Sequence, residues 1–135
     1  MSSFPLKIVT PDGLIFDGEA QMLIVRTIAG DLAVMARHIN CVAPLGMGRA
    51  TVVDANGSRR YAACIGGMIS VHEGQVNLVP TTFEWAESID EVRAQLSQER
   101  AEKVLRNKDA SAADLKLAEA RLRRALIRKS VAANK

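Results

Sequence analysis

The stretch "SIDEVRAQLSQERAEKVLRN", Ser88–Asn107, decides how this 135-residue chain is organised. Its apolar residues recur at intervals of three and four, and the Gln, Glu, Arg and Lys residues between them favour a helix. Ser88 and Glu91 have the spacing of a capping box, in which each side chain accepts a free backbone N–H. A charged helix is therefore predicted to begin at Ser88. Its predicted apolar stripe is Ile89, Val92, Leu96 and Val104, with Ala94, Ala101 and Leu105 beside it.

A second helix is predicted after this one. Asn107-Lys108-Asp109 interrupts the pattern, and Ser111 with Asp114 resembles a new helix start. Two helices joined by a few residues form an antiparallel hairpin. Each apolar seam is thin and rich in alanine, so the hairpin buries little surface and is expected to be the mobile part of the chain. The second stripe is Leu115, Ala118, Leu122 and Leu126.

The residues before Ser88 have the pattern of β-structure. Short runs rich in β-branched residues, such as "LKIVT", "MLIVRT" and "RATVVD", alternate with turn signals. Asn56-Gly57 predicts a hairpin with a type I′ turn, and Gly66-Gly67 predicts a bulge or a close backbone approach. Gly46-Met47-Gly48 is interpreted as a loop between strands. The predicted fold is α+β, an antiparallel β-sandwich over residues 1–86 followed by a two-helix hairpin over residues 87–135.

Composition narrows the class of protein. The formal net charge is +3. The surplus of basic residues lies from Glu87 onward, where the sequence has 12 Lys and Arg residues and 8 Asp and Glu residues. Cys41 and Cys64 lie in no metal-ligand pattern and suggest a reducing compartment. No apolar run approaches the roughly 20 residues that span a bilayer, and the start lacks the pattern of a secretory signal. We expect no direct insertion into a membrane.

The sequence does not indicate a catalyst or a nucleic-acid-binding protein. None of the common nucleophile, zinc or phosphate-loop motifs is present, and His38 and His72 are far apart. Four arginines in "RLRRALIRKS" form a basic patch, but only 4% of the residues are aromatic. Stacking platforms for single-stranded nucleic acid are therefore missing. We predict no catalytic residue, no metal site and no nucleic-acid partner.

The layout resembles a known family, the epsilon subunits of F-type ATP synthases. "LKIVTPDGLIFDGEAQMLIVRTIAGDLAVMARH" resembles the N-terminal pattern of that family, and "GGMISVHEGQVNLV" resembles its Gly-Gly segment. "SIDEVRAQLSQERAEKVL" resembles the start of its C-terminal hairpin. One loop departs from the family, because Ala36-Arg37 stands where Pro-Gly usually precedes the histidine that corresponds to His38.

The resemblance implies a non-catalytic part of a rotor stalk that couples proton translocation to ATP synthesis. The sandwich would bind the gamma subunit and the ring of c subunits, with Asp31 facing the ring and His38 facing gamma. The hairpin would extend into the alpha/beta catalytic head and inhibit ATP hydrolysis. These partners would hold the protein at the cytoplasmic face of the bacterial plasma membrane, as a peripheral protein that requires no cofactor.

The resemblance also implies a regulatory ATP site, since some bacterial members bind ATP through Ile/Leu-Asp-x-x-Arg-Ala. Ile89, Asp90, Arg93 and Ala94 match that motif, and Arg100 lies two turns after Arg93. Arg124 and Arg128 on the second helix would complete the phosphate contacts. A purely structural interpretation stays open, in which the Asp90 carboxylate interacts favourably with the helix dipole and forms an ion pair with Arg93. An alternative function, a stand-alone ATP-binding regulator that uses the same hairpin, also stays open.

Overall fold

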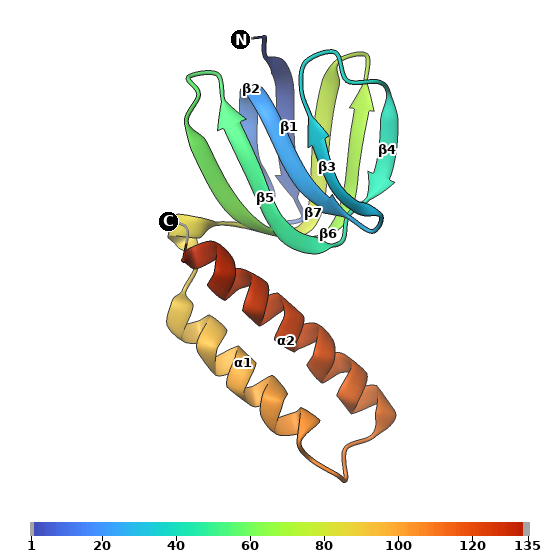
Figure 1. Cartoon of the computed structure of the whole chain (residues 1–135), viewed down its shortest axis with the longest axis vertical. Helices are drawn as coiled ribbons and strands as arrows, with labels where there is room; N and C mark the ends of the chain where they lie inside the picture. Colours follow the sequence, from blue (N-terminus) through green and yellow to red (C-terminus); the bar gives the residue numbers. More distant parts are fainter. Residues whose placement is uncertain (1, 134–135) are drawn as a thin grey trace. The chain divides into compact units, whose positions relative to one another are not determined.

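The computed structural model describes residues 2–133, and seven strands precede two helices in it (Figure 1). The strands are β1 (Phe4–Thr10), β2 (Gly13–Thr27), β3 (Gly30–Val34), β4 (Cys41–Pro44), β5 (Met47–Asp54), β6 (Arg59–His72) and β7 (Gln75–Trp85). A short 3₁₀ turn, η1 (Ala86–Ser88), leads to α1 (Glu91–Leu105) and α2 (Ala112–Ala132). The predicted order of a β-sandwich followed by a helical hairpin is confirmed.

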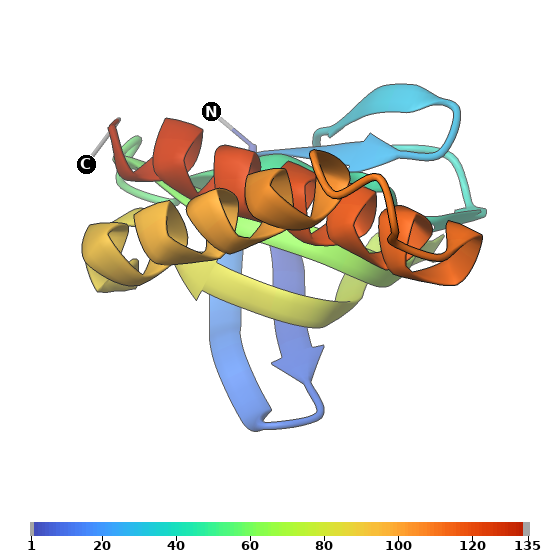
Figure 2. The same cartoon turned by 90° about the horizontal axis from the view of Figure 1, so that it is seen from below.

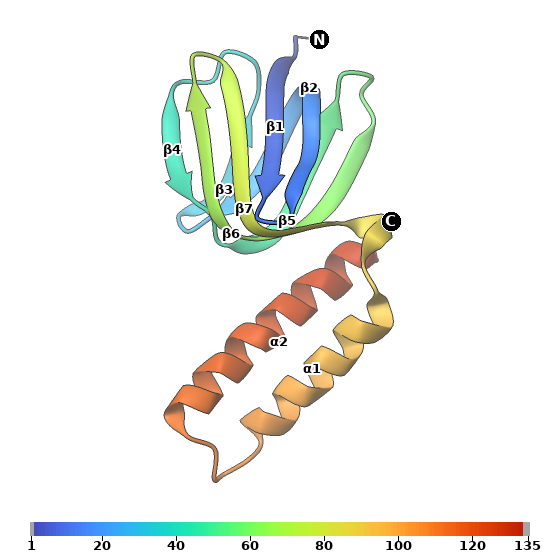
Figure 3. The ribbon, with the colours of Figure 1, turned by 180° about the vertical axis from the view of Figure 1, so that it is seen from behind.

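The sheet closes on itself through β1. β1 pairs antiparallel with β2 on one edge and parallel with β7 on the other, and the order continues through β6 and β5 back to β2 (Figure 3). The parallel β1–β7 pair departs from the predicted antiparallel arrangement. The first and last strands run in the same direction, so the ring can close only through a parallel pair. β3 pairs with β2, and β4 pairs with β6.

The core of this unit follows the two-residue period of a strand. Along β1, Phe4, Leu6 and Ile8 are buried, while the intervening Pro5 and Lys7 are exposed. Side chains on successive residues point to opposite faces, so one face of each strand enters the core and the other meets solvent. The largest fully buried side chains in the unit are aliphatic, among them Leu23, Ile69 and Leu78.

The hairpin between β5 and β6 forms where predicted, but its turn is not type I′. Only Gly57 has a positive φ, of 83°, and its N–H donates to the carbonyl of Asp54 at 3.0 Å. The Asp54 carboxylate also accepts the N–H groups of Asn56 and Ser58. This side chain stabilises the connection at residues 55–58, in which Gly57 is left-handed. Both positive φ angles instead occur at Glu73-Gly74, between β6 and β7.

Gly66 and Gly67 confirm the predicted close approach. Their φ angles are 69° and 97°, and a Cβ at Gly67 would lie 2.1 Å from the carbonyl oxygen of Val79. Only a residue without a Cβ lets β6 pass β7 at this distance.

The first helix begins later than predicted. Ser88 ends the 3₁₀ turn, and Asp90 is the N-cap, since its carboxylate accepts the N–H of Arg93 at 3.0 Å. The predicted Ser88–Glu91 capping box is therefore wrong, because an aspartate two residues nearer the helix provides the cap. The second start is confirmed, because Ser111 Oγ accepts the N–H of Asp114 at 3.1 Å.

The chain divides into two compact units, of which one ends at Trp85 and the other begins at Ala86. The predicted division was one residue later. Trp85 ends β7 with its ring under the guanidinium of Arg60, 3.7 Å from the ring centroid, and edge-on to Phe83. These contacts attach the last residue of the sandwich unit to its own sheet.

Gly67→Ala is expected to destabilise the sandwich unit by about 2–4 kcal/mol, because it adds both a backbone clash and an unfavourable φ. Gly74→Ala is the matched control, because its φ is 81° but nothing lies within 4 Å of an added Cβ. It should cost only about 1–2 kcal/mol. Urea unfolding measures both, and equal losses would show that the Val79 contact is unimportant.

Candidate functional site

The two helices pack through alanine rather than through the predicted stripe. Ala94 and Ala101 are the buried residues of α1, and α2 buries Ala118 and Ala125 at the same seven-residue spacing. The stripe prediction for α1 is wrong at Val92 and Leu96, which are 70% and 45% exposed, whereas Ile89 is buried as predicted. Small side chains let two helices approach closely, so alanine forms the buried contact, whereas Val92, Leu96 and Leu126 remain exposed. Figure 2 shows α1 and α2 side by side.

Arginines occupy one side of this helix pair. Arg93, Arg100 and Arg124 each directly precede a buried alanine of the seam. In an antiparallel pair, a two-fold rotation perpendicular to the plane of the two helices relates one helix to the other. Residues that precede a seam alanine by the same number of positions therefore lie on the same side of the pair. Arg128 lies one turn beyond Arg124 on that side. Within residues 2–133, Arg93, Arg100 and Arg124 make no ion pair.

The structure places the remaining residues of the predicted ATP motif in structural roles. Ile89 and Ala94 are buried, with 4% of their surface exposed, so neither offers a side chain to a ligand. Asp90 is exposed, but its carboxylate already caps α1. Arg93 takes part in that cap only through its backbone N–H, which leaves its guanidinium available.

A groove opens on a different side of the hairpin. Glu91, Val92, Gln95, Leu96 and Lys129 line about 430 Å³ of mostly apolar space. Lys129 reaches from α2 to α1 and donates to Gln98 Oε1 at 2.7 Å. Gln95 follows Ala94 in the sequence, whereas Arg93 precedes it, so the groove and the arginine side are separate features.

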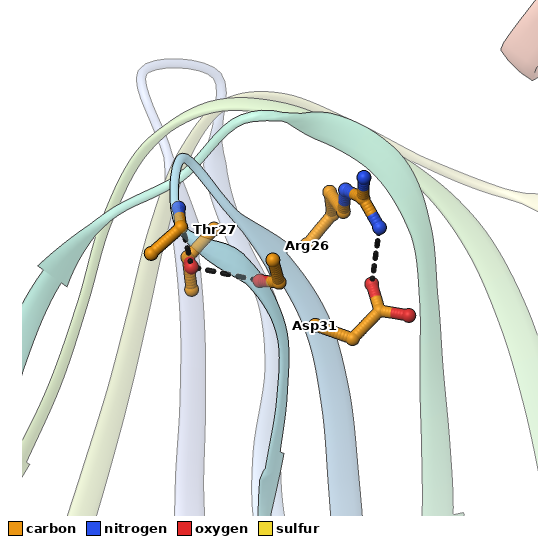
Figure 4. Close-up of polar contacts among 5 residues, drawn as sticks. Arg26, Thr27 and Asp31 are labelled. Carbon is orange, nitrogen blue, oxygen red and sulfur yellow. Dashed lines mark hydrogen bonds and ion pairs between the residues drawn. The ribbon is translucent and has the colours of Figure 1, made fainter.

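Asp31 lies at the tip of the β2–β3 hairpin, opposite Arg26 in the strand register (Figure 4). Its carboxylate accepts the guanidinium of Arg26 at 3.3 Å, and both side chains are exposed. Thr27 Oγ1 stabilises the tip by donating to the carbonyl of Gly30 at 2.7 Å. Ile28, which is 74% exposed, is the apolar residue at the end of the tip.

Gly48 explains how Arg26 is held at this tip. A Cβ on Gly48 would lie 2.6 Å from Cβ of Arg26, so the arginine stem lies across the bare backbone of β5. Gly46-Met47-Gly48 is therefore not simply the predicted loop, because it continues into β5 as a platform for Arg26. An exposed pair of this kind contributes about 0.2–1 kcal/mol, so Asp31 can exchange Arg26 for another cation.

His38 closes a tight turn at the end of the sandwich unit. Its N–H donates to the carbonyl of Met35 at 3.2 Å, and its Nδ1 lies 2.8 Å from the carbonyl of Ile39. Arg37, the third residue of the turn, has a φ of 69°, which makes this a type II turn. Pro-Gly is the residue pair that such a turn favours, and Ala36-Arg37 keeps the same turn with a more strained residue.

The described part of the chain offers no sign of a catalytic or metal centre. Residues 2–133 contain no group of His, Cys, Asp and Glu that could hold a metal ion. Burial raises the pKa of the Cys64 thiol to about 12, so Cys64 is not a nucleophile at neutral pH. No helix among the same residues is long and apolar enough to cross a bilayer.

Comparison with known proteins identifies the family. A family model described as the beta-sandwich domain of the ATP synthase delta/epsilon chain matches residues 3–86. A second, the long alpha-helix domain of the same chain, matches residues 87–133. The chain belongs to the epsilon-chain family of F-type ATP synthases. Epsilon chains are non-catalytic subunits, so the prediction that the chain is not itself an enzyme is confirmed.

Relatives match along the whole length. The ATP synthase epsilon chain of Bacillus velezensis is 40% identical over 134 residues, which covers 99% of this chain and 100% of that one. The epsilon chain of Halalkalibacterium halodurans is 37% identical over 132 residues and covers 98% of both.

Two solved structures share the fold at low sequence identity. A chain of the Euglena gracilis mitochondrial ATP synthase, in a structure of OSCP, F1 and the c-ring, has a TM-score of 0.85 at 22% identity. The match covers 100% of this chain and 83% of that one. A chain of the Tetrahymena thermophila central stalk and c-ring has a TM-score of 0.62 at 15% identity, with 95% of both chains covered.

Sequence reasoning missed three features of these surfaces. Arg26 was not singled out, although its place four residues before Gly30 in a short hairpin could have paired it with Asp31. The alanine seam was assigned a secondary role, although the seven-residue repeat of Ala94 and Ala101, and of Ala118 and Ala125, was visible. The left-handed conformation of Arg37 had no signal in this sequence alone.

Asp90→Ala is expected to lower the stability of the hairpin by about 1 kcal/mol, because it removes the cap of α1. Asp90→Asn should change stability by only a few tenths of a kcal/mol, since asparagine also caps helices well. Thermal unfolding followed by circular dichroism measures both, with Asp109→Ala in the connection between the helices as control. Equal losses for the alanine and asparagine variants would contradict a capping role.

Proposed function

We propose that the chain is the non-catalytic epsilon subunit of the rotor in an F-type ATP synthase, where it couples proton translocation to ATP synthesis. The observation that carries this proposal is the full-length match, at 40% identity, to the epsilon chain of Bacillus velezensis. Its partners are the gamma subunit, the c-subunit ring and the alpha/beta catalytic head. These partners hold it at the cytoplasmic face of the bacterial plasma membrane as a peripheral subunit.

The tip of the β2–β3 hairpin supports contact with the c ring. It presents exposed Ile28 for apolar contact and Asp31 for a basic residue on the ring loops. Arg26 keeps the Asp31 carboxylate in place before docking and can be replaced by a partner cation. His38, in the tight turn at residues 35–38, serves the contact with gamma.

We expect the chain to co-purify with the gamma subunit and the c ring when the tagged protein is isolated from its host. Asp31→Lys should weaken retention of the c ring about tenfold or more while gamma is retained, because it places like charges against each other. Lys7→Glu, a charge reversal elsewhere on the sandwich, is the control. Isolation of the chain without gamma would instead favour a stand-alone regulator.

The hairpin supports a regulatory role with ATP as ligand. Arg93, Arg100, Arg124 and Arg128 gather on one side of the helix pair, and guanidinium groups bind phosphate oxygens with matching geometry. The thin alanine seam buries little apolar surface, so the folded hairpin is only weakly stabilised by itself. A ligand that bridges both helices would add about 2.7 kcal/mol at a hundredfold excess over its dissociation constant. High ATP would then hold the hairpin folded and relieve inhibition of hydrolysis.

MgATP titrated into the protein in a calorimeter should bind at one site. Arg93→Ala and Arg100→Ala should each weaken binding about tenfold or more, because each removes a charge-assisted hydrogen bond. Arg123→Ala is the matched control, since Arg123 is exposed on α2 but does not share the offset from the seam.

Two outcomes would contradict the ATP site. One is the absence of both heat and thermal stabilisation at millimolar MgATP, which would leave Ile89–Ala94 as a capped helix start. The other is equal weakening by Arg123→Ala, which would reduce binding to general attraction between a basic helix and a nucleotide. Neither outcome affects the proposal that the chain is a rotor subunit, because co-purification tests that separately.

A further inference from the structure

Two residues in the sandwich unit have an unusual backbone conformation. Within residues 2–133, Arg37 and Glu73 are the only non-glycine residues with a positive φ, at 69° and 48°. Both line the same hollow, which has a volume of about 670 Å³ and is bordered by the start of the chain and by Asn40. Side chains other than glycine are strained in this conformation, and such strain is concentrated at functional sites.

The strain at Glu73 is compensated within the protein. Glu73 and Gly74 form the two-residue turn between β6 and β7, where both φ angles must be positive. Asn40 fixes Glu73 from across the hollow. Its Oδ1 accepts the N–H of Glu73 at 2.9 Å, and its Nδ2 donates to the carboxylate at 3.3 Å. The side chain of Glu73 therefore contributes to its own turn.

The strain at Arg37 has no such compensation. The turn is closed by backbone atoms of Met35 and His38, and it needs nothing from the arginine side chain. Within residues 2–133 the exposed guanidinium makes neither a hydrogen bond nor an ion pair. Glycine would make the same turn with less strain. The arginine thus lowers stability without an internal contact in return.

The surroundings of Arg37 have the character of a protein-binding surface. Ile39 and Val42, which follow it, are 77% and 68% exposed, and Met35 before it is half exposed. Exposed apolar side chains next to an unpaired arginine are typical of interfaces between proteins, where arginine is enriched. The Glu73 carboxylate keeps its negative charge, but it already has a hydrogen-bond partner in the neutral Asn40 amide, whereas Arg37 presents its positive charge with no partner within residues 2–133.

We propose that Arg37 is a binding residue of this chain and pairs with a carboxylate on the gamma subunit at the hollow beside His38. This inference rests on the proposed function, because it assumes that gamma docks at the 35–42 segment. The pair compensates in the complex for the strain that Arg37 imposes on the free subunit. Arg37 therefore adds affinity and selectivity for an acidic partner surface.

Arg37→Gly tests the inference because it should change stability and binding in opposite directions. Relief of the strain should raise the melting temperature of the sandwich unit by about 4–8 °C. Loss of the cation should weaken binding of the full chain to a gamma-containing catalytic head about tenfold and reduce the salt dependence of binding.

Three variants separate charge from conformation. Asparagine tolerates a positive φ but carries no charge, so Arg37→Asn should weaken binding as much as Arg37→Gly does. Arg37→Lys keeps the charge but lacks the guanidinium fork, so its loss should be smaller. Arg59→Ala removes another exposed arginine of the same unit and should leave binding unchanged.

A stabilised Arg37→Gly variant with unchanged affinity would overturn the inference, and so would a variant that loses stability. Failure of the wild-type chain to bind the gamma-containing head would overturn the proposed function itself. Equal weakening by Arg59→Ala would also count against a specific contact at Arg37.

Discussion

The sandwich unit depends on the double pairing of β1. One edge of this strand bonds antiparallel to β2 and the other bonds parallel to β7, so the first and last strands of the unit meet and the sheet closes. Phe4, Leu6 and Ile8 enter the core from this strand. Closure removes the unpaired edges that β2 and β7 would otherwise expose.

The hairpin is built on a different principle. Its contact is an alanine seam, in which each side chain buries little apolar area, so close approach of the helices brings only modest stabilisation. Several larger apolar side chains are exposed instead of buried, among them Val92 and Leu96. Arg93, Arg100 and Arg124 add charge on one side of the seam, and none of them makes an ion pair within residues 2–133. Folding of the hairpin is therefore sensitive to anything that binds both helices.

Local strain and local compensation differ between the two turns at the hollow. Glu73 takes a left-handed conformation and makes two hydrogen bonds with Asn40, one as donor and one as acceptor. Arg37 takes the same conformation, and its side chain makes none within residues 2–133. The strain at Glu73 is therefore compensated within the chain. In the proposed complex, the strain at Arg37 is compensated only when a partner supplies a carboxylate, so the stability of the subunit depends on its assembly.

Much of the fold follows from the sequence alone. The two-residue period before Trp85, the three- and four-residue period after it, and the glycine pair at Gly66-Gly67 all act over a few neighbouring residues, so local patterns reveal them. Competition between nearby groups was decided only in three dimensions. Asp90, not Ser88, caps the first helix. At Asn56-Gly57, hydrogen bonds to the Asp54 carboxylate stabilise a turn other than the expected type I′. Arginines of α1 and α2 share one side, because helix packing brings residues that are distant in the sequence together. Such contacts depend on the tertiary structure, since no spacing along the chain specifies which elements will pack against each other.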